Sequence, residues 1–123
     1  MPNLSYPVFV TGSTGQVGSA LINQLAENAV GLSRSDLDLQ KCDEIIAKLD
    51  ALISKHGKPS AFINACAYTA VDAAEDDYEN ALAVNGTAVG ILSKFCFEND
   101  IPFVHYSTDY VFAGDGETAW DEN

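Results

Sequence analysis

A glycine-rich turn is the first place in this 123-residue sequence where residue types and spacing could do chemistry. Gly12, Gly15 and Gly18 follow a short apolar run at 7–11 and open a stretch with helical periodicity at 16–27. Such glycines allow a tight turn, a close approach of the backbone to a pyrophosphate and close packing of the helix. Free amides at the helix start would supply positive potential. The pattern predicts a dinucleotide site, although a purely structural strand-to-helix turn would use the same glycines.

The residues after the second predicted strand bear on which dinucleotide would bind. An NAD site usually has an acidic residue there to hold the ribose 2′-hydroxyl. This sequence has Ser33-Arg34-Ser35, and a guanidinium flanked by hydroxyls suits a 2′-phosphate. The sequence therefore favours NADPH, with NADH possible. The alternative is a solvated Arg34 with Asp36 as the ribose ligand.

The elements that must position these residues alternate along the chain. Apolar, β-branched runs predict four strands, at 7–11, 29–33, 60–65 and 101–107. Helical spacing predicts the intervening helices, at 16–27, 43–56, 73–83 and 84–99. This order is typical of an α/β fold of the Rossmann type, a doubly wound parallel sheet covered on both faces. The whole chain, 1–123, is predicted to be one dinucleotide-binding domain.

Charge and composition exclude some classes of partner. With 18 acidic and 6 basic residues the net charge is −12, which argues against nucleic acid and anionic membranes. No apolar run approaches the ~18 residues of a membrane span, and no signal peptide is evident. The three cysteines lack metal-ligand spacing, so they are interpreted as small apolar side chains of a reduced, cytoplasmic protein.

Two further segments are much more specific than the glycines. The stretch NACAYTAVD at 64–72 and the stretch HYSTDYVF at 105–112 resemble signature segments of the dTDP-4-dehydrorhamnose reductases, which are extended short-chain dehydrogenases/reductases. The resemblance runs from the glycine turn through Gly116. It implies NADPH-dependent reduction of the C4 ketone of dTDP-4-dehydro-L-rhamnose, the last step of dTDP-L-rhamnose biosynthesis, with a nucleotide-sugar as substrate.

The resemblance also implies roles for particular residues. Those around the dinucleotide would be Gly12, Ser13, Thr14, Gly15, Gln16 and Val17 at the pyrophosphate, Asp38 and Leu39 beside the adenine, Ala65, Cys66 and Ala67 under the cofactor, and Thr69 and Val71 near the nicotinamide. Thr108 matches the catalytic hydroxyl, flanked by Ser107 and Asp109, and Asn85 matches a helix start near the site. A hydroxyl at a strand end could polarise a sugar ketone for hydride attack. Without the resemblance, Thr108 is more simply a capping hydroxyl.

The sequence departs from the family pattern in one respect. None of its five tyrosines is followed four residues later by lysine, whereas the family's reaction needs a Tyr-x-x-x-Lys pair as proton donor. We therefore interpret the chain as an incomplete domain, without the C-terminal substrate-binding part, that binds NADPH weakly and is inactive alone. The alternatives are a non-catalytic module resembling the methionine adenosyltransferase β subunit, and a relative acting on another nucleotide-sugar as epimerase or dehydratase. The oligomeric state stays open.

Other titratable residues are interpreted as structural. His105 lies in an apolar strand and is expected to be a core histidine, and His56 is expected to cap the carbonyls of a helix end. The acidic residues at 72–79 are typical of a solvated helix start. Some family members hold a metal at a dimer contact through a glutamate that corresponds to Ala20, so no metal is predicted.

Overall fold

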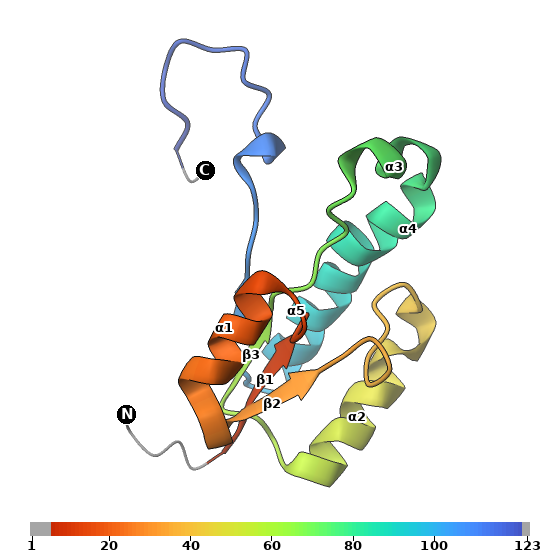
Figure 1. The fold of residues 1–123 in the computed structure, drawn as a ribbon, viewed down its shortest axis with the longest axis vertical. Coiled ribbons are helices and arrows are strands. Elements are labelled where there is room, and N and C mark those ends of the chain that lie inside the picture. The colour runs from red at the N-terminus through yellow and green to blue at the C-terminus, as the bar shows by residue number, and fades with distance from the viewer. Residues whose placement is uncertain (1–5, 122–123) are drawn as a thin grey trace.

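The computed structural model describes residues 6–121, in which four parallel strands form one sheet between helices (Figure 1). The strands are β1 (Val8–Thr11), β2 (Ala29–Leu32), β3 (Ala61–Asn64) and β4 (Phe103–His105). Their order is β2-β1-β3-β4, and every pair is parallel. The chain thus winds outward in both directions from a switch point between β1 and β3, which confirms the predicted doubly wound fold.

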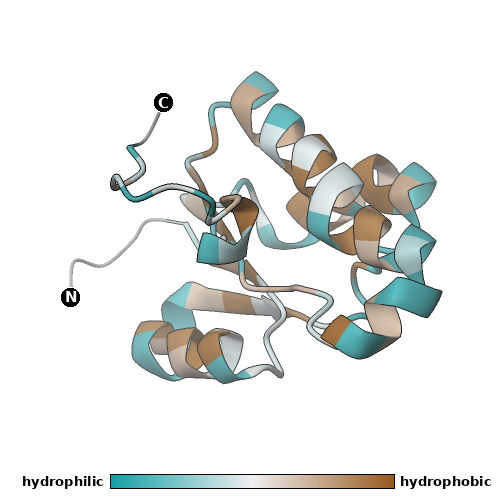
Figure 2. Ribbon diagram, turned by 90° about the horizontal axis from the view of Figure 1, so that it is seen from above, coloured by the Kyte–Doolittle hydropathy of each residue, from teal (hydrophilic) through white to brown (hydrophobic). Residues whose placement is uncertain are grey.

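Helices cover the two faces of the sheet (Figures 1 and 2). Helix α1 (Gln16–Leu25) packs on β1 and β2, whereas α2 (Ile45–His56) and α5 (Ala88–Glu98) pack together across the opposite face. In Figure 2 the helices alternate between apolar and polar segments, as expected for elements with one buried face. The main core lies between the sheet and α2 and α5, and it contains Phe9, Leu32, Leu37, Leu39, Ile45, Leu49, Phe62, Val84, Ala88, Leu92, Phe95, Cys96 and Ile101.

The helical region between β3 and β4 differs from the prediction of two helices that meet at 83/84. Its first piece is α3 (Val71–Asp76), and its second begins with α4 (Tyr78–Leu82) and continues through a π-helical turn, η3 (Ala83–Thr87), into α5. The break falls at Asp77, whose carboxylate accepts hydrogen bonds from the side chains of Tyr68 and Asn80. The π turn lets the helix pass through 83/84 without a break.

The last strand is shorter than the predicted 101–107. Three residues of β4 pair with residues 62–64 of β3, and β3 ends at Asn64, so residues 106 and 107 find no ladder partner. Beyond β4 the chain leaves the sheet and extends away from the body (Figure 1). Short 3₁₀ turns occur at η1 (Ala26–Asn28), η2 (Cys42–Glu44) and η4 (Asp109–Val111).

The first two helices also begin or end inside their predicted ranges. Helix α1 stops at Leu25 instead of residue 27, and the 3₁₀ turn η1 replaces its last residues. Helix α2 begins at Ile45 after η2 and ends, as predicted, before Gly57. Within residues 6–121 no helix combines the length and the apolar character that crossing a bilayer requires.

Candidate dinucleotide site

The glycine turn lies at the switch point of the sheet. Gly12 has φ +65°, and a Cβ there would lie 2.5 Å from the carbonyl oxygen of Ala65 in the loop after β3. A Cβ at Gly18 would lie 1.9 Å from the carbonyl oxygen of Gly12, so the first turn of α1 packs directly on the glycine turn. The amide of Gly15 closes the turn by donating to the carbonyl of Gly12 at 3.0 Å. The turn therefore has room for backbone only.

The start of α1 keeps its amides available. Gly15 precedes the helix and offers no side chain to cap it, and the first turn holds no acidic residue. The helix dipole and the unpaired amides of the first turn together favour an anion at this point. Ser13 is half-buried and Thr14 to Val17 are exposed, so the turn is open to solvent and to a ligand. This arrangement can hold a diphosphate without any basic side chain.

The end of β2 is organised by two carboxylates. Asp36 accepts the amide of Ser33 at 2.8 Å and its hydroxyl at 2.7 Å, and these hydrogen bonds lower the pKa of Asp36 below its ordinary value of 3.8. Asp38 pairs with the exposed Arg34 at 3.4 Å. The hydroxyl of Ser33 also lies 2.7 Å from that of Ser35. Asp36 is therefore turned back onto its own loop, which disfavours the alternative in which it holds a ribose hydroxyl.

Asp36 should make unfolding depend on pH in the acid range. The pKa of Asp36 is lower in the folded chain than in the unfolded chain. Its contribution to the free energy of unfolding is therefore fully present above pH 3.8 and is lost as the pH falls through the folded pKa. In urea denaturation followed by circular dichroism, Asp36→Asn should lower the free energy of unfolding at pH 7. The difference in this free energy between the variant and the wild type should become smaller as the pH falls below the folded pKa of Asp36. Asp43→Asn, at an exposed site in η2, serves as control. A gap that does not change with pH would contradict the role given to Asp36.

The loop after β3 is fastened by the π turn. The side-chain amide of Asn85 accepts the backbone N–H of Tyr68 at 2.8 Å and donates to its carbonyl at 3.0 Å. The hydroxyl of Tyr68 donates to Asp77 at 3.1 Å. Partial desolvation, and to a smaller extent this hydrogen bond, raise the pKa of Tyr68. Since π turns often occur at functional sites, the position of Asn85 in this turn also indicates a functional site nearby.

The predicted cofactor residues of this loop differ in exposure. Ala65 and Cys66 are half-buried, and burial raises the pKa of the Cys66 thiol. Ala67, Thr69 and Val71 are exposed, and the Val71 side chain is 78% exposed. The loop thus presents small side chains beside Gly12 and leaves its outer half open toward solvent.

A polar row crosses the sheet at the last residues of three strands. Thr11, Asn64 and His105 are direct partners in the register. The Thr11 hydroxyl donates to Asn64 Oδ1 at 2.5 Å, and Asn64 Nδ2 lies 3.1 Å from His105 Nδ1. Asn64 Oδ1 also accepts the amide of Cys66 at 3.3 Å, while Asn64 itself is fully buried. The row therefore ties the loop after β3 to the sheet.

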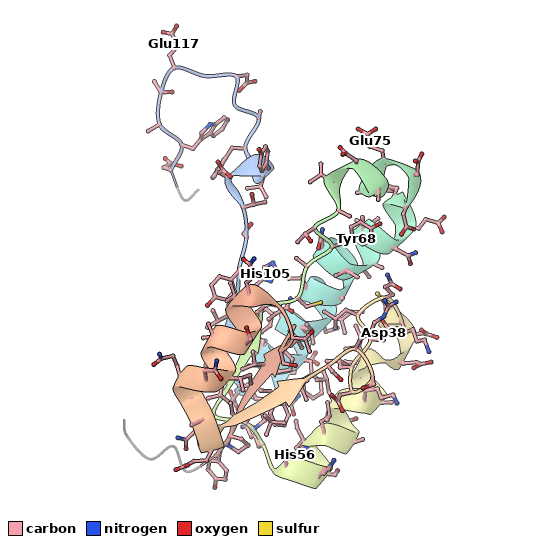
Figure 3. The ribbon with its side chains drawn as sticks, viewed as in Figure 1. Asp38, His56, Tyr68, Glu75, His105 and Glu117 are labelled. Atoms are coloured by element: carbon pink, nitrogen blue, oxygen red, sulfur yellow. The ribbon has the colours of Figure 1, made fainter. Side chains whose placement is uncertain are left out.

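Sequence reasoning named His105 but missed the row. The signal was available, because each of these polar residues ends a predicted strand and parallel strand ends align at one edge. His105 also stacks on Phe103, with ring centroids 6.4 Å apart, but it is only half-buried and lies at the margin of the core that was expected to hold it. Figure 3 places Asp38, Tyr68 and His105 on the side of the sheet where the strands end, and His56 at the opposite end.

Thr108 lies beyond β4 on the segment that leaves the sheet. Its Oγ1 accepts the amide of Tyr110 at 3.3 Å and donates to Asp109 at 3.2 Å, and the side chain is exposed. In the described part of the chain no hydrogen bond joins Thr108 to the glycine turn. The hydroxyl caps η4 here, and its catalytic role stays a prediction.

Three other expectations have clear structural outcomes. His56 makes no hydrogen bond to the helix carbonyls in the described range; its ring packs edge-on against Phe9 at 6.1 Å, and Gly57 caps α2 by donating to Ile53. The interpretation of His56 as a cap is therefore wrong. Leu39 is buried in the core, so its place beside an adenine stays a prediction. Burial raises the pKa of Cys96 to about 11, in keeping with an apolar role.

Comparison with known proteins places this geometry in a family. The model of the RmlD substrate binding domain matches residues 6–123. The dTDP-4-dehydrorhamnose reductase of Burkholderia thailandensis is 46% identical over 87% of this chain and 35% of its own length. A solved dTDP-4-dehydrorhamnose reductase from Clostridium acetobutylicum is 28% identical, with a TM-score of 0.79 over 94% of this chain and 41% of its own.

A second solved relative carries a ligand. The dTDP-4-dehydrorhamnose reductase of Bacillus anthracis, solved in complex with NADP, is 26% identical, with a TM-score of 0.78 over 95% of this chain and 41% of its own. The present chain thus spans between about a third and two-fifths of the length of the relatives it matches.

Proposed function

The chain belongs to the RmlD substrate binding domain family, and we propose that it forms the NADPH-binding part of a dTDP-4-dehydrorhamnose reductase. The observation that carries this proposal is the glycine turn at the switch point. It has room for backbone only, it is followed by an uncapped helix start, and it lies beside the loop after β3. Parallel sheets of this kind bind dinucleotides at that point.

The residues of the site have distinct roles in this proposal. The free amides of the glycine turn and of the first turn of α1 bind the pyrophosphate, Arg34 contacts the 2′-phosphate, and the loop at 65–71 lies under the nicotinamide half. NADPH supplies the hydride when it is bound. Thr108 orients the sugar by donating its hydroxyl proton to the C4 ketone in place of Asp109, which favours the developing negative charge on oxygen. The relative solved with NADP and the reductase relatives support this assignment over a regulatory module or an epimerase.

We further propose that the 123 residues alone do not turn over the nucleotide-sugar. The family's proton donor is a Tyr-x-x-x-Lys pair, and no tyrosine here has lysine four residues later. Without that donor the alkoxide formed by hydride attack is not protonated efficiently near neutral pH.

Two measurements test the proposal. Titration of the purified chain with NADPH, followed by calorimetry and nicotinamide fluorescence, should give saturable binding. Loss of NADPH absorbance with dTDP-4-dehydro-L-rhamnose should stay at the level of a blank. Absence of binding would overturn the proposed cofactor role, and measurable turnover would overturn the proposed inactivity.

Replacing Arg34 by aspartate should shift the cofactor preference from NADPH toward NADH. Arg34→Asp puts a carboxylate where the 2′-phosphate is proposed to bind, so the ratio of the NADPH to the NADH dissociation constant should rise about tenfold or more. Lys58→Asp, an exposed charge reversal in the loop between α2 and β3, is the control and should leave the ratio unchanged. An unchanged ratio in Arg34→Asp would remove Arg34 from the phosphate site.

A further inference from the structure

The Arg34 guanidinium is held by two neighbours from the same loop. Its Nε lies 3.4 Å from Asp38 Oδ2, and its Nη2 donates to Gln40 Oε1. Asp38 is itself fixed, since its other oxygen accepts the backbone N–H of Gln40 at 3.0 Å. Asp38 and Gln40 are both half-buried, whereas the Arg34 side chain is 70% exposed. Two half-buried acceptors therefore hold one solvent-exposed cation.

These contacts occupy one edge of the guanidinium and leave the other edge free to bind a ligand. The group is planar, and Nε–H points in the same direction as one of the Nη2–H bonds. Asp38 and Gln40 accept on that side edge. The N–H groups that remain are those of Nη1 and the second one of Nη2, which together form the end edge. Such an edge matches two oxygens of a phosphate monoester in a bidentate pair.

The two acceptors act differently on an incoming anion. Asp38 carries a charge, so it attracts Arg34 but also repels a phosphate. Gln40 fixes the same guanidinium without adding charge. Gln40 thus orients Arg34 without neutralising its charge, and a cation that is to bind a further anion needs such a neutral partner.

The position of this group relative to the rest of the site is also defined. Arg34 and Asp38 lie close enough to the loop after β3 for their charges to shift the pKa of the Cys66 thiol, Arg34 downward and Asp38 upward. Gly31 of β2 approaches Ser13, because a Cβ at Gly31 would lie 3.0 Å from the Cβ of Ser13. The end of β2, the glycine turn and the loop after β3 thus converge, so a dinucleotide on the glycine turn would bring its adenosine ribose toward Arg34.

We propose that Gln40 is a specificity-determining residue, which positions the Arg34 guanidinium so that its end edge receives the 2′-phosphate of a phosphorylated adenosine ribose. Gln40 touches Arg34 and not the cofactor, so it acts through Arg34 as a positioning residue. The inference rests on the proposed binding of NADPH at the glycine turn, and it goes beyond that proposal by assigning the source of the preference for NADPH over NADH.

The test compares dissociation constants of NADPH and NADH, measured by calorimetry, in four variants of the whole chain. Gln40→Met keeps the length of the side chain and removes the acceptor, and Arg34→Met removes the cation. The double variant combines them. Gln24→Met, on the exposed outer face of α1, is the matched control. Gln40→Met should weaken NADPH about five-fold, the size expected for one hydrogen bond to a charged group, and should leave NADH unchanged.

The double variant separates positioning from a general structural role. Once Arg34 is absent, Gln40→Met should change NADPH binding by less than about two-fold, because the two side chains act as one unit. Equal weakening of both cofactors, or an undiminished effect in the double variant, would overturn the proposal while leaving the dinucleotide site intact. Failure of the wild-type chain to bind either cofactor would overturn the dinucleotide site, and this inference with it.

Discussion

Replacing Gly18 by alanine lowers the free energy of unfolding by about 3 kcal/mol and weakens NADPH about tenfold or more. The added methyl group would lie 1.9 Å from the carbonyl oxygen of Gly12 and 2.6 Å from its carbonyl carbon. Both are backbone atoms of the glycine turn, so no side chain can move aside. The helix start must withdraw from the turn, and its amides then no longer converge on the pyrophosphate.

Gly90 provides the matched control for this substitution. It is also a helical glycine, on the exposed part of α5, but a Cβ there meets no atom within 4 Å. Gly90→Ala should therefore stabilise the chain by roughly 0.5–1 kcal/mol, because alanine has the higher helix propensity, and should leave NADPH binding unchanged. Urea denaturation of both variants measures the difference. Equal stabilities for the two would show that the turn can open without cost, contrary to the packing described.

The parts of the fold that the sequence predicted are those set by local patterns. Apolar runs located β1 to β4, and their alternation with helical periodicity predicted a parallel sheet. The break at Asp77 was missed because it depends on Tyr68, nine residues away along the chain. The shortening of β4 also depends on a distant partner, the end of β3. Local periodicity carries no information about such contacts.

The residues of the candidate site likewise include some that local sequence patterns predicted and others that only the folded structure reveals. The spacing of the glycines identified the turn, because backbone approach demands residues without a Cβ. The position of Arg34 after β2 suggested a phosphate ligand. Gln40 was not noticed, since a single amide in a polar loop has no characteristic spacing. The commitment of Asp36 to Ser33 likewise appears only in three dimensions.

Asn64 should be the most costly polar residue of the sheet to replace. It is fully buried, and its Oδ1 accepts both the hydroxyl of Thr11 and the amide of Cys66. Asn64→Leu keeps a similar volume but leaves both donors without a partner, and a buried donor left unsatisfied costs about 1–3 kcal/mol. We expect a loss of about 3 kcal/mol in the free energy of unfolding, with weaker NADPH binding because the loop at 65–71 loses its tie to β3.

A second substitution distinguishes the loss of these hydrogen bonds from simple misfit of leucine. Thr11→Val removes the buried hydroxyl, so in Asn64→Leu it also removes one of the two unsatisfied donors. The double variant should then be about 1 kcal/mol more stable than the sum of the single effects predicts, because replacing both partners by apolar groups avoids the desolvation penalty. Denaturation of the four proteins under one buffer condition closes this cycle. Strictly additive effects would mean that the Thr11 hydroxyl and the Asn64 side chain are not coupled, and that the leucine destabilises the core by its shape alone.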